Sequence, residues 1–146
     1  EVAAASTMLL FYGVGGEVRT ARLFAPLRAM GKTLALPRCL PGRRMEARIV
    51  TPEHSPTPGA YGIPEPGEDC PGLDQGMIDL ILVPALCYDR SRFRLGQGGG
   101  YYDRYLAGYK GCTVGLCRND LLQEGLPHTQ TDIPVKILLT ETVCIR

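Results

Sequence analysis

Asp79-Leu80-Ile81-Leu82-Val83-Pro84 is the stretch that decides the fold of this chain. Its four consecutive apolar residues, bounded by an aspartate and a proline, predict a short strand buried on both faces. Strands of this kind are typical of parallel sheets, because the helices that connect parallel strands cover both faces of the sheet. The stretch therefore indicates an α/β protein.

An earlier part of the chain predicts a βαβ unit. The apolar run Met8–Tyr12 predicts a buried strand, Glu17–Met30 has apolar residues at helical spacing, and Thr33–Leu36 predicts a second strand closed by Pro37. Pro26 conflicts with this helix, because proline in a helix interior costs about 3 kcal/mol. We therefore expect a helix that is kinked, broken or late in starting.

Further elements follow along the chain. Arg43–Val50 alternates like an antiparallel strand, Cys112–Cys117 and Val135–Leu139 predict strands, and Tyr101–Tyr109 predicts a short helix. Residues 52–76 are rich in Pro, Gly, Glu and Asp and predict an ordered surface loop. We expect one α/β domain over residues 1–146, with ligands beyond the carboxyl ends of its parallel strands.

The overall composition sets limits on function. The chain has 146 residues, 45% of them hydrophobic and 21% charged, with a net charge of +1. This length allows a real core, and the charge balance argues against a disordered chain and against a nonspecific nucleic-acid binder. No apolar run is as long as a membrane-spanning helix, so we expect no membrane partner.

Cysteine and histidine usage gives a second limit. The chain has six cysteines, no Cys-x-x-Cys pair and two histidines, so a structural zinc site is poorly supported. Four of the cysteines lie in apolar runs, where buried free thiols are common. We expect a reducing, cytoplasmic compartment; a disulfide framework is the less favoured alternative.

A glycine-rich loop follows the strand at 79–84. It reads Arg94-Leu95-Gly96-Gln97-Gly98-Gly99-Gly100-Tyr101-Tyr102-Asp103. Exposed backbone N–H groups before a helix suit phosphate, while Arg94 adds a cation and Asp103 a possible oxygen ligand for magnesium. The alternative is a turn whose glycines only permit positive φ. The spacing fits neither a dinucleotide-binding fingerprint nor a P-loop.

Other polar residues could take part in the same site. Asp89, Asp103 and Asp132 are candidate magnesium ligands, although Asp103 could simply begin a helix and Asp132 could cap a turn. Two aromatic–carboxylate pairs suit a flat heterocycle with N–H donors, although each tyrosine could equally lie at the edge of the core. These pairs are Tyr12 with Glu17, and Tyr61 with Glu65.

Taken in order, these motifs resemble the 5-formyltetrahydrofolate cyclo-ligase family, also called methenyltetrahydrofolate synthetases. The most specific block is Arg94-Leu95-Gly96 through Gly100-Tyr101-Tyr102-Asp103, which follows the segment 79–89. The resemblance continues upstream and downstream over nearly the whole chain. It is carried there by Glu17-Val18-Arg19-Thr20, Leu36-Pro37-Arg38, Gly62-Ile63-Pro64-Glu65-Pro66, Val114-Gly115-Leu116, Leu126-Pro127, Asp132 and Thr140-Glu141.

The resemblance implies a three-layer-like sandwich with a mostly parallel central sheet, of the NagB/RpiA/CoA-transferase-like class. It also implies a reaction that uses ATP and Mg²⁺. ATP phosphorylates the formyl oxygen of 5-formyltetrahydrofolate, N10 attacks the activated carbon, and phosphate leaves to give 5,10-methenyltetrahydrofolate. The partner is then a small-molecule folate, with or without a polyglutamate tail, and we expect a monomer that binds no nucleic acid.

The resemblance also assigns roles to residues. It assigns catalysis to Arg94, Tyr102 and Asp103, and magnesium binding to Asp103 and Asp132. ATP binding falls to the loop residues Arg94, Leu95, Gly96, Gln97, Gly98, Gly99, Gly100, Tyr101 and Tyr102. Folate binding falls to Tyr12, Glu17, Tyr61, Gln97, Gly98, Gly99, Gly100 and Tyr101.

Three features depart from the family pattern. Arg92 stands where the family usually has glycine, and Pro26 is unexpected in the first helix. The family also has an N-terminal helical region whose Lys and Arg reach the ATP phosphates, and no such residues precede Glu1 here. We therefore expect residues 1–146 alone to bind ATP weakly or to need those missing residues to turn over. The alternatives are a non-catalytic folate- or nucleotide-binding module and a relative acting on another formylated or pyrimidine substrate.

Overall fold

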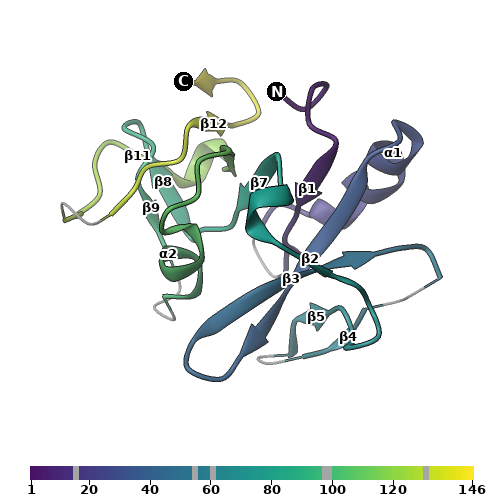
Figure 1. Cartoon of the computed structure of the whole chain (residues 1–146). Coiled ribbons are helices and arrows are strands. Elements are labelled where there is room, and N and C mark those ends of the chain that lie inside the picture. The colour runs from purple at the N-terminus through teal and green to yellow at the C-terminus, as the bar shows by residue number, and fades with distance from the viewer. Residues whose placement is uncertain (15–16, 54–55, 60–61, 97–99, 130–131) are drawn as a thin grey trace.

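The computed structural model describes residues 1–14, 17–53, 56–59, 62–96, 100–129 and 132–146 (Figure 1). Its helices are two α-helices and three short 3₁₀ turns in these ranges. They are α1 (Phe24–Ala29), α2 (Tyr101–Leu106), η1 (Thr20–Leu23), η3 (Gln75–Met77) and η4 (Asn119–Leu121). None of these helices is long and apolar enough to cross a membrane.

The strands of the described ranges form one large sheet and two small ones. The large sheet contains β1 (Thr7–Leu9), β2 (Thr33–Leu40), β3 (Arg44–Val50), β6 (Gly72–Leu73), β7 (Leu80–Val83), β10 (Cys112–Leu116), β12 (Ile137–Leu139) and β13 (Cys144–Ile145). The small sheets contain β8 (Cys87–Asp89), β9 (Arg94–Leu95) and β11 (Leu122–Gln123), and β4 (Thr57–Pro58) with β5 (Pro64–Glu65).

The predicted parallel sheet is confirmed. The strand order is β13-β12-β10-β7-β1-β2-β3-β6, and the five strands from β12 to β2 run parallel to one another. Antiparallel pairs extend both edges, β13 on β12 at one side and β3 and β6 at the other. The strand expected at 79–84 is β7, and it lies near the middle of the sheet.

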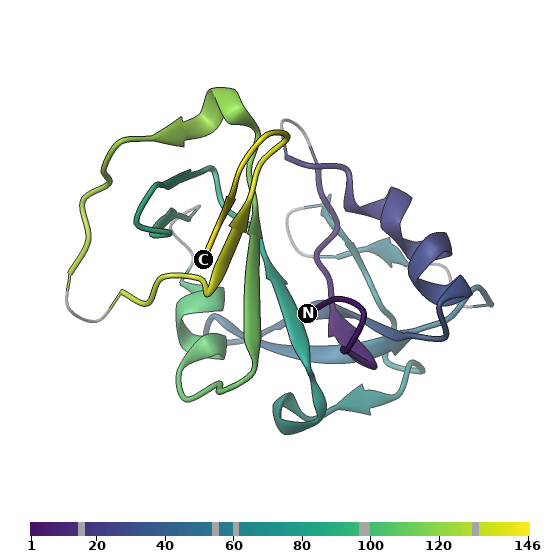
Figure 2. The same ribbon diagram turned by 90° about the horizontal axis from the view of Figure 1, so that it is seen from above.

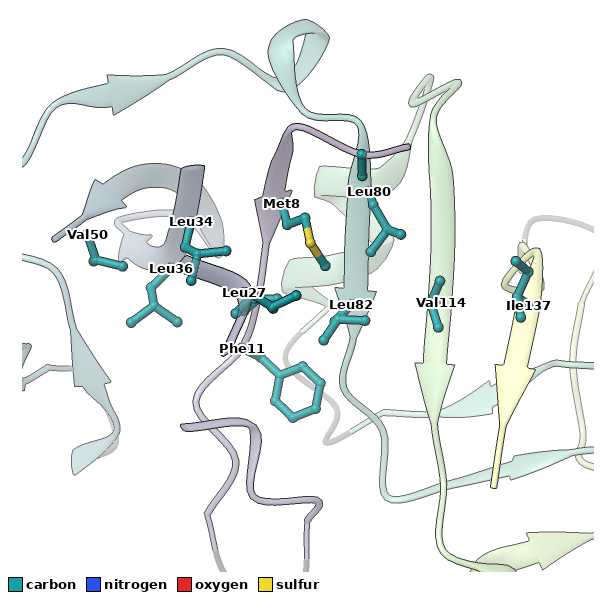
Figure 3. Packing of buried hydrophobic residues seen from close by; sticks show 12 residues of the cluster. Met8, Phe11, Leu27, Leu34, Leu36, Val50, Leu80, Leu82, Val114 and Ile137 are labelled. Carbon is teal, nitrogen blue, oxygen red and sulfur yellow. The ribbon is translucent and has the colours of Figure 1, made fainter. Parts of the chain in front are cut away.

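Alternate residues of the parallel strands point to opposite faces, and each face carries its own hydrophobic cluster. Met8, Leu34 and Leu80 belong to the first cluster, whereas Leu9 and Ile81 belong to the second. Figure 3 shows the first cluster, where side chains from all five parallel strands gather with Leu27 of α1. Burial on both faces is what the continuous apolar runs predict.

The two helices cover opposite faces of the sheet (Figure 2), which gives the three-layer arrangement. Phe24 and Leu27 of α1 pack against the first cluster. Tyr101, Tyr102 and Tyr105 of α2 pack against the second. The helical layers are thin, because each helix has only six residues.

Both helices are shorter than predicted. The helix expected over Glu17–Met30 is irregular at first, and its α-helical part begins at Phe24. Pro26 therefore stands in the first turn, where no intrahelical N–H bond is needed, which resolves the conflict. The helix expected over Tyr101–Tyr109 ends at Leu106, and Gly108 with φ of +78° turns the chain away.

Strand β2 is longer than predicted, because it does not stop at Pro37 but runs to Leu40. Ala35 is the last residue of β2 that pairs with β1, so beyond it the strand needs hydrogen-bond donors only toward β3. A proline, which has no N–H, is tolerated where one side of a strand lacks a neighbour in the sheet. The strand predicted at Arg43–Val50 is β3 and is antiparallel as expected.

The small sheet β11-β8-β9 packs beside the carboxyl end of the large sheet and carries two buried polar residues. The Tyr88 ring has no exposed surface, and its hydroxyl donates to the Val83 carbonyl at 2.6 Å. Asp89 accepts the N–H groups of Phe93 and Leu126, both at 2.9 Å. Asp89 therefore holds loops together and lies 2% exposed, instead of offering a carboxylate to a metal.

Arg92 has φ of +72°, a left-handed conformation that favours glycine, which is the residue that the resemblance implies at this position. We expect Arg92→Gly to be more stable than Arg92→Ala by about 1 kcal/mol, because a Cβ is strained in the left-handed region. Both variants lose the Arg92 bond to the Lys136 carbonyl, so this loss cancels. Urea unfolding measures the difference.

The neighbouring Arg90 is the matched control, since its φ is not positive. There the order should reverse, with Arg90→Ala at least as stable as Arg90→Gly. Equal stability of the two Arg92 variants would contradict the strain argument.

Candidate functional site

A cavity of about 350 Å³ opens beyond the carboxyl ends of β1, β7 and β10, where ligands of parallel α/β sheets bind. Most of its walls are apolar, and Glu17 and Arg118 are the charged residues among those that line it. The lining residues are Phe11, Val14, Glu17, Val18, Ala85, Leu86, Cys87, Tyr88, Leu116, Cys117, Arg118 and Leu121. We call this space the sheet-end cavity.

Among the described residues that are predicted to bind substrate, Glu17 lines the sheet-end cavity. Its Oε1 accepts the Val14 N–H at 3.1 Å, which fixes the carboxylate against the backbone. Partial burial raises the pKa of Glu17, and the bond from Val14 opposes this only in part. A carboxylate held in an apolar wall suits a ligand that brings N–H donors, because such a ligand restores the lost hydration.

The loop between β1 and η1 is fixed by hydrogen bonds of its own. Thr20 is fully buried; its hydroxyl donates to the Phe11 carbonyl and accepts the Gly13 N–H at 3.0 Å. The chain folds back here and brings the Val18 carbonyl against Gly13. A Cβ at Gly13 would overlap this carbonyl, so only glycine fits at the fold-back. These contacts therefore hold the described residues at the two ends of the loop, around Gly13 and around Thr20, in a set arrangement.

Tyr12 lines a different cavity from Glu17. Its ring meets Phe24 edge-on, with ring centres 6.5 Å apart. It lines a second cavity of about 310 Å³ together with Gly13, Arg19, Ala21 and Arg22. The two residues predicted to lie side by side at the folate thus face different cavities, and Arg19 and Arg22 were not anticipated.

Arg94 is held by three groups that converge on its guanidinium. It donates to Asp103 Oδ1 at 2.9 Å and to the Pro84 carbonyl at 3.3 Å, and it lies 5.8 Å from the centre of the Tyr102 ring. Its side chain is only 11% exposed, whereas that of Asp103 is 68% exposed. The structure therefore brings together the three residues predicted to be catalytic, at the carboxyl end of β7.

Tyr102 brings a buried hydroxyl to this group. Among the described residues, the Tyr102 and Tyr105 hydroxyls are buried without a hydrogen-bond partner. Burial raises the pKa of Tyr102 well above its ordinary value, and nearby Arg94 opposes this only in part. Tyr102 is therefore a neutral donor at physiological pH, and a buried donor without a partner favours a ligand acceptor beside it.

The rest of the predicted loop is described in part. Leu95 is half exposed, and Gly100 begins α2 with φ of +73°, a conformation that suits glycine. A Cβ on Gly96 would lie 3.0 Å from Arg94 Nη1, so this glycine leaves room for the guanidinium. Tyr61, Gln97, Gly98 and Gly99 lie outside the described residues.

The second carboxylate of the aromatic pairs has a structural contact. Glu65 of β5 accepts the Cys39 N–H of β2 at 2.9 Å. The same carboxylate and Tyr101 also interact with the Cys39 thiol, and burial is the largest cause that raises its pKa to about 11. Cys39 thus links β2 with β5 and with the start of α2. Nothing in the sequence around Cys39 indicates these contacts.

The candidate magnesium ligands are not joined by any contact. Asp132 is exposed, and its Oδ2 accepts the Thr129 N–H at 2.9 Å, as expected for a residue that caps a turn. Within the described ranges no three His, Cys, Asp or Glu residues form a metal-binding group.

Comparisons with known proteins support the resemblance. The sequence profile of the 5-formyltetrahydrofolate cyclo-ligase family matches residues 1–141. The chain is 31% identical to the 5-formyltetrahydrofolate cyclo-ligase of Escherichia coli K12 over 95% of this chain and 80% of that protein. It is 30% identical to a probable 5-formyltetrahydrofolate cyclo-ligase of Schizosaccharomyces pombe, over 89% of this chain and 72% of that protein.

A solved structure agrees with these sequence matches. The solution structure of Aquifex aeolicus 5,10-methenyltetrahydrofolate synthetase superposes with a TM-score of 0.85 and 34% identity, covering 99% of this chain and 73% of that one. Profile, relatives and fold point the same way, and the predicted resemblance is confirmed. This chain belongs to the 5-formyltetrahydrofolate cyclo-ligase family of ligases.

Proposed function

We propose that this chain converts 5-formyltetrahydrofolate to 5,10-methenyltetrahydrofolate, using ATP and Mg²⁺ and releasing ADP and phosphate. The observation that carries the proposal is the Arg94 group beside the sheet-end cavity. There a nearly buried guanidinium, paired with Asp103 at 2.9 Å, lies over Tyr102. The cavity offers Glu17 in an apolar wall for the ligand's N–H donors.

The chemistry needs such a cation. Ring closure forms a bond from N10 to the formyl carbon and breaks the bond from that carbon to its oxygen, which is a poor leaving group. ATP supplies the phosphoryl group with which the oxygen departs as phosphate. The guanidinium of Arg94 stabilises the negative charge on the transferring group, and the Tyr102 hydroxyl donates to an oxygen of the ligand.

Asp103 is the better placed of the two proposed magnesium ligands. One of its oxygens pairs with Arg94, and its side chain is 68% exposed, so the other oxygen is open to a cation. Mg²⁺ in phosphate sites usually takes one or two carboxylates and completes its shell with phosphate oxygens and water. Asp103 alone fits that requirement, and a role for Asp132 needs the chain around it to approach α2.

The direct test is an absorbance assay for methenyltetrahydrofolate with the chain, ATP, MgCl₂ and 5-formyltetrahydrofolate. We expect product only when all three are present. Folate binding without any product would favour the non-catalytic module instead. Product from a different formylated substrate alone would favour a relative with another specificity.

We further propose a monomer that acts in a reducing compartment such as the cytoplasm. All six cysteines lie in the described ranges, and all have free thiols. Burial raises the pKa of the Cys112 and Cys117 thiols, which keeps them protonated and slow to react.

Replacing Glu17 with glutamine should stabilise the free protein and weaken its binding to folate. The raised pKa of Glu17 means that the folded state carries an unfavourable charge once pH rises above the ordinary value of 4.5. The melting temperature of Glu17→Gln should therefore exceed that of wild type at pH 7, and the difference should vanish below about pH 4. Folate affinity at pH 7 should fall roughly tenfold, because a charged acceptor is lost.

Glu124→Gln is the control, since the Glu124 side chain is 90% exposed. It should change neither folate affinity nor the pH dependence of melting. A Glu17→Gln protein that binds folate as well as wild type would remove Glu17 from the site.

A further inference from the structure

A second guanidinium group, that of Arg104, lies against the start of α2. A Cβ placed on Gly100 would lie 3.2 Å from its Nη1 atom and 3.9 Å from its Cζ atom. Residues four apart are neighbours on a helix, and helical side chains lean toward the N-terminus, so Arg104 reaches back to Gly100. Because Gly100 has no side chain, the guanidinium comes close to the backbone where the glycine-rich loop ends.

Arg94 is placed in a similar way at the other end of that loop. A Cβ on Gly96 would lie 3.0 Å from the Nη1 atom of Arg94. Each of the two described ends of the loop therefore has a glycine with a guanidinium group against it. The missing side chains of Gly96 and Gly100 leave the space that the two cations occupy.

Arg104 differs from the other arginines of this region because its guanidinium has no acceptor. It is exposed, and its side chain makes no hydrogen bond or ion pair within the described ranges. Four other arginines between residues 90 and 118 each donate to a carboxylate or a carbonyl, and these are Arg90, Arg92, Arg94 and Arg118. An arginine that folds back loses rotamer freedom, and a ligand that accepts its N–H groups would offset this loss.

The charge balance of the Arg94 group also favours a further cation. The charge of Arg94 is already compensated by Asp103, with which it pairs at 2.9 Å. A nucleoside triphosphate that carries one Mg²⁺ remains negative, so its phosphates favour a guanidinium that no carboxylate has neutralised. Arg104 is the next residue after Asp103 and provides such a group.

We propose that Arg104 binds a phosphate oxygen of ATP at the Gly100 end of the loop, as a second cation in addition to Arg94. The inference rests on the proposed function. Arg94, which is enclosed and paired, stabilises charge that develops during transfer of the phosphoryl group. Arg104, which is exposed, binds the phosphates equally well before and during that step. A group of this second kind affects KM more than kcat.

The test is the dissociation constant of ATP in the presence of Mg²⁺, measured by titration calorimetry for wild type and Arg104→Gln. We expect Arg104→Gln to weaken ATP binding about tenfold, because one charge-assisted bond to phosphate is lost. Its affinity for 5-formyltetrahydrofolate should stay the same. Arg104→Lys should restore most of the ATP affinity, since a point charge also binds phosphate. In steady-state assays the KM for ATP should rise more than kcat falls, the opposite of the result expected for Arg94→Gln.

Arg90→Gln is the matched control, because the Arg90 side chain is 54% exposed and its replacement removes the same charge. It should leave the ATP affinity at the wild-type value. An Arg104→Gln protein that unfolds in urea like wild type and binds ATP as tightly overturns the inference, and so does one that loses folate affinity instead.

The inference and the proposed function can fail separately. ATP binding that depends on Arg104 without any product would support this inference and remove the proposed activity. Product formation with an ATP affinity that does not depend on Arg104 would do the reverse. A wild-type chain that binds no ATP would remove both.

Discussion

Arg94→Gln should lower kcat/KM for methenyltetrahydrofolate formation by about 10³-fold, the size typical of a lost charge-stabilising donor. Glutamine keeps much of the side-chain length and removes the charge. In wild type the guanidinium has little freedom, because the Pro84 carbonyl and Asp103 hold it over the Tyr102 ring. A guanidinium held in this way does not have to move when negative charge develops on the transferring phosphoryl group in the transition state. Its loss should therefore lower mainly kcat.

Two further variants separate charge from geometry. Arg94→Lys keeps a cation but cannot bridge Asp103 and Pro84 with one planar group, so its activity should be intermediate. Asp103→Asn should cost activity by itself. Because Asp103 pairs with Arg94, the double variant Arg94→Gln/Asp103→Asn should be less impaired than the product of the two single effects.

Arg48→Gln is the matched control for Arg94. Arg48 is similarly enclosed, with a side chain 20% exposed, and it pairs with Glu46 of the same strand, β3, at 2.7 Å. Its loss should lower the free energy of unfolding and leave kcat/KM of the folded protein unchanged. An Arg94→Gln protein with normal unfolding and normal kcat/KM would exclude Arg94 from catalysis.

The sheet was predictable because its signal is local. A strand buried on both faces must be continuously apolar, and Leu80–Val83 has no other reasonable structure between Asp79 and Pro84. Helix lengths were less predictable. Apolar spacing continues to Met30 on one side and Tyr109 on the other, but Pro26 delays the first helix and Gly108 ends the second.

The Arg94 group was predictable from the order of residues along one loop, since Arg94, Tyr102 and Asp103 are neighbours in sequence. Contacts between distant segments were not. Cys39 meets Glu65 across 26 residues, and Asp89 meets Leu126 across 37, and neither side chain carries a signal of its partner. Asp89, a candidate metal ligand by its sequence, is a structural acceptor of two backbone N–H groups.

Tyr12 and Glu17 illustrate a third limit. Their spacing allows them to lie together, and only the fold-back at Gly13 turns them toward different cavities. The clash that demands glycine there involves the Val18 carbonyl, a backbone atom that no residue pattern reveals. For the same reason, Arg19 and Arg22 look like ordinary solvated charges until the backbone places them at a cavity.

Gly115→Ala should lower the free energy of unfolding by about 3 kcal/mol, through overpacking together with a disturbed buried hydrogen bond. A Cβ on Gly115 of β10 would lie 2.5 Å from Tyr88 Cζ and 2.7 Å from its hydroxyl oxygen. The ring has no exposed surface, and its hydroxyl donates to the Val83 carbonyl, so the ring cannot move aside without leaving that donor unpaired. Equilibrium urea unfolding measures the loss.

Gly125→Ala is the control, because a Cβ there meets no atom within 4 Å and its φ is not positive; it should change stability by less than about 0.5 kcal/mol. Tyr88→Leu in the Gly115→Ala background should be less destabilising than the two single losses added together, since leucine frees the space that the new methyl needs. Wild-type stability of Gly115→Ala would mean that Tyr88 can move. Tyr88 also lines the sheet-end cavity. Gly115→Ala should therefore weaken folate binding as well, because a displaced Tyr88 changes the wall of the cavity.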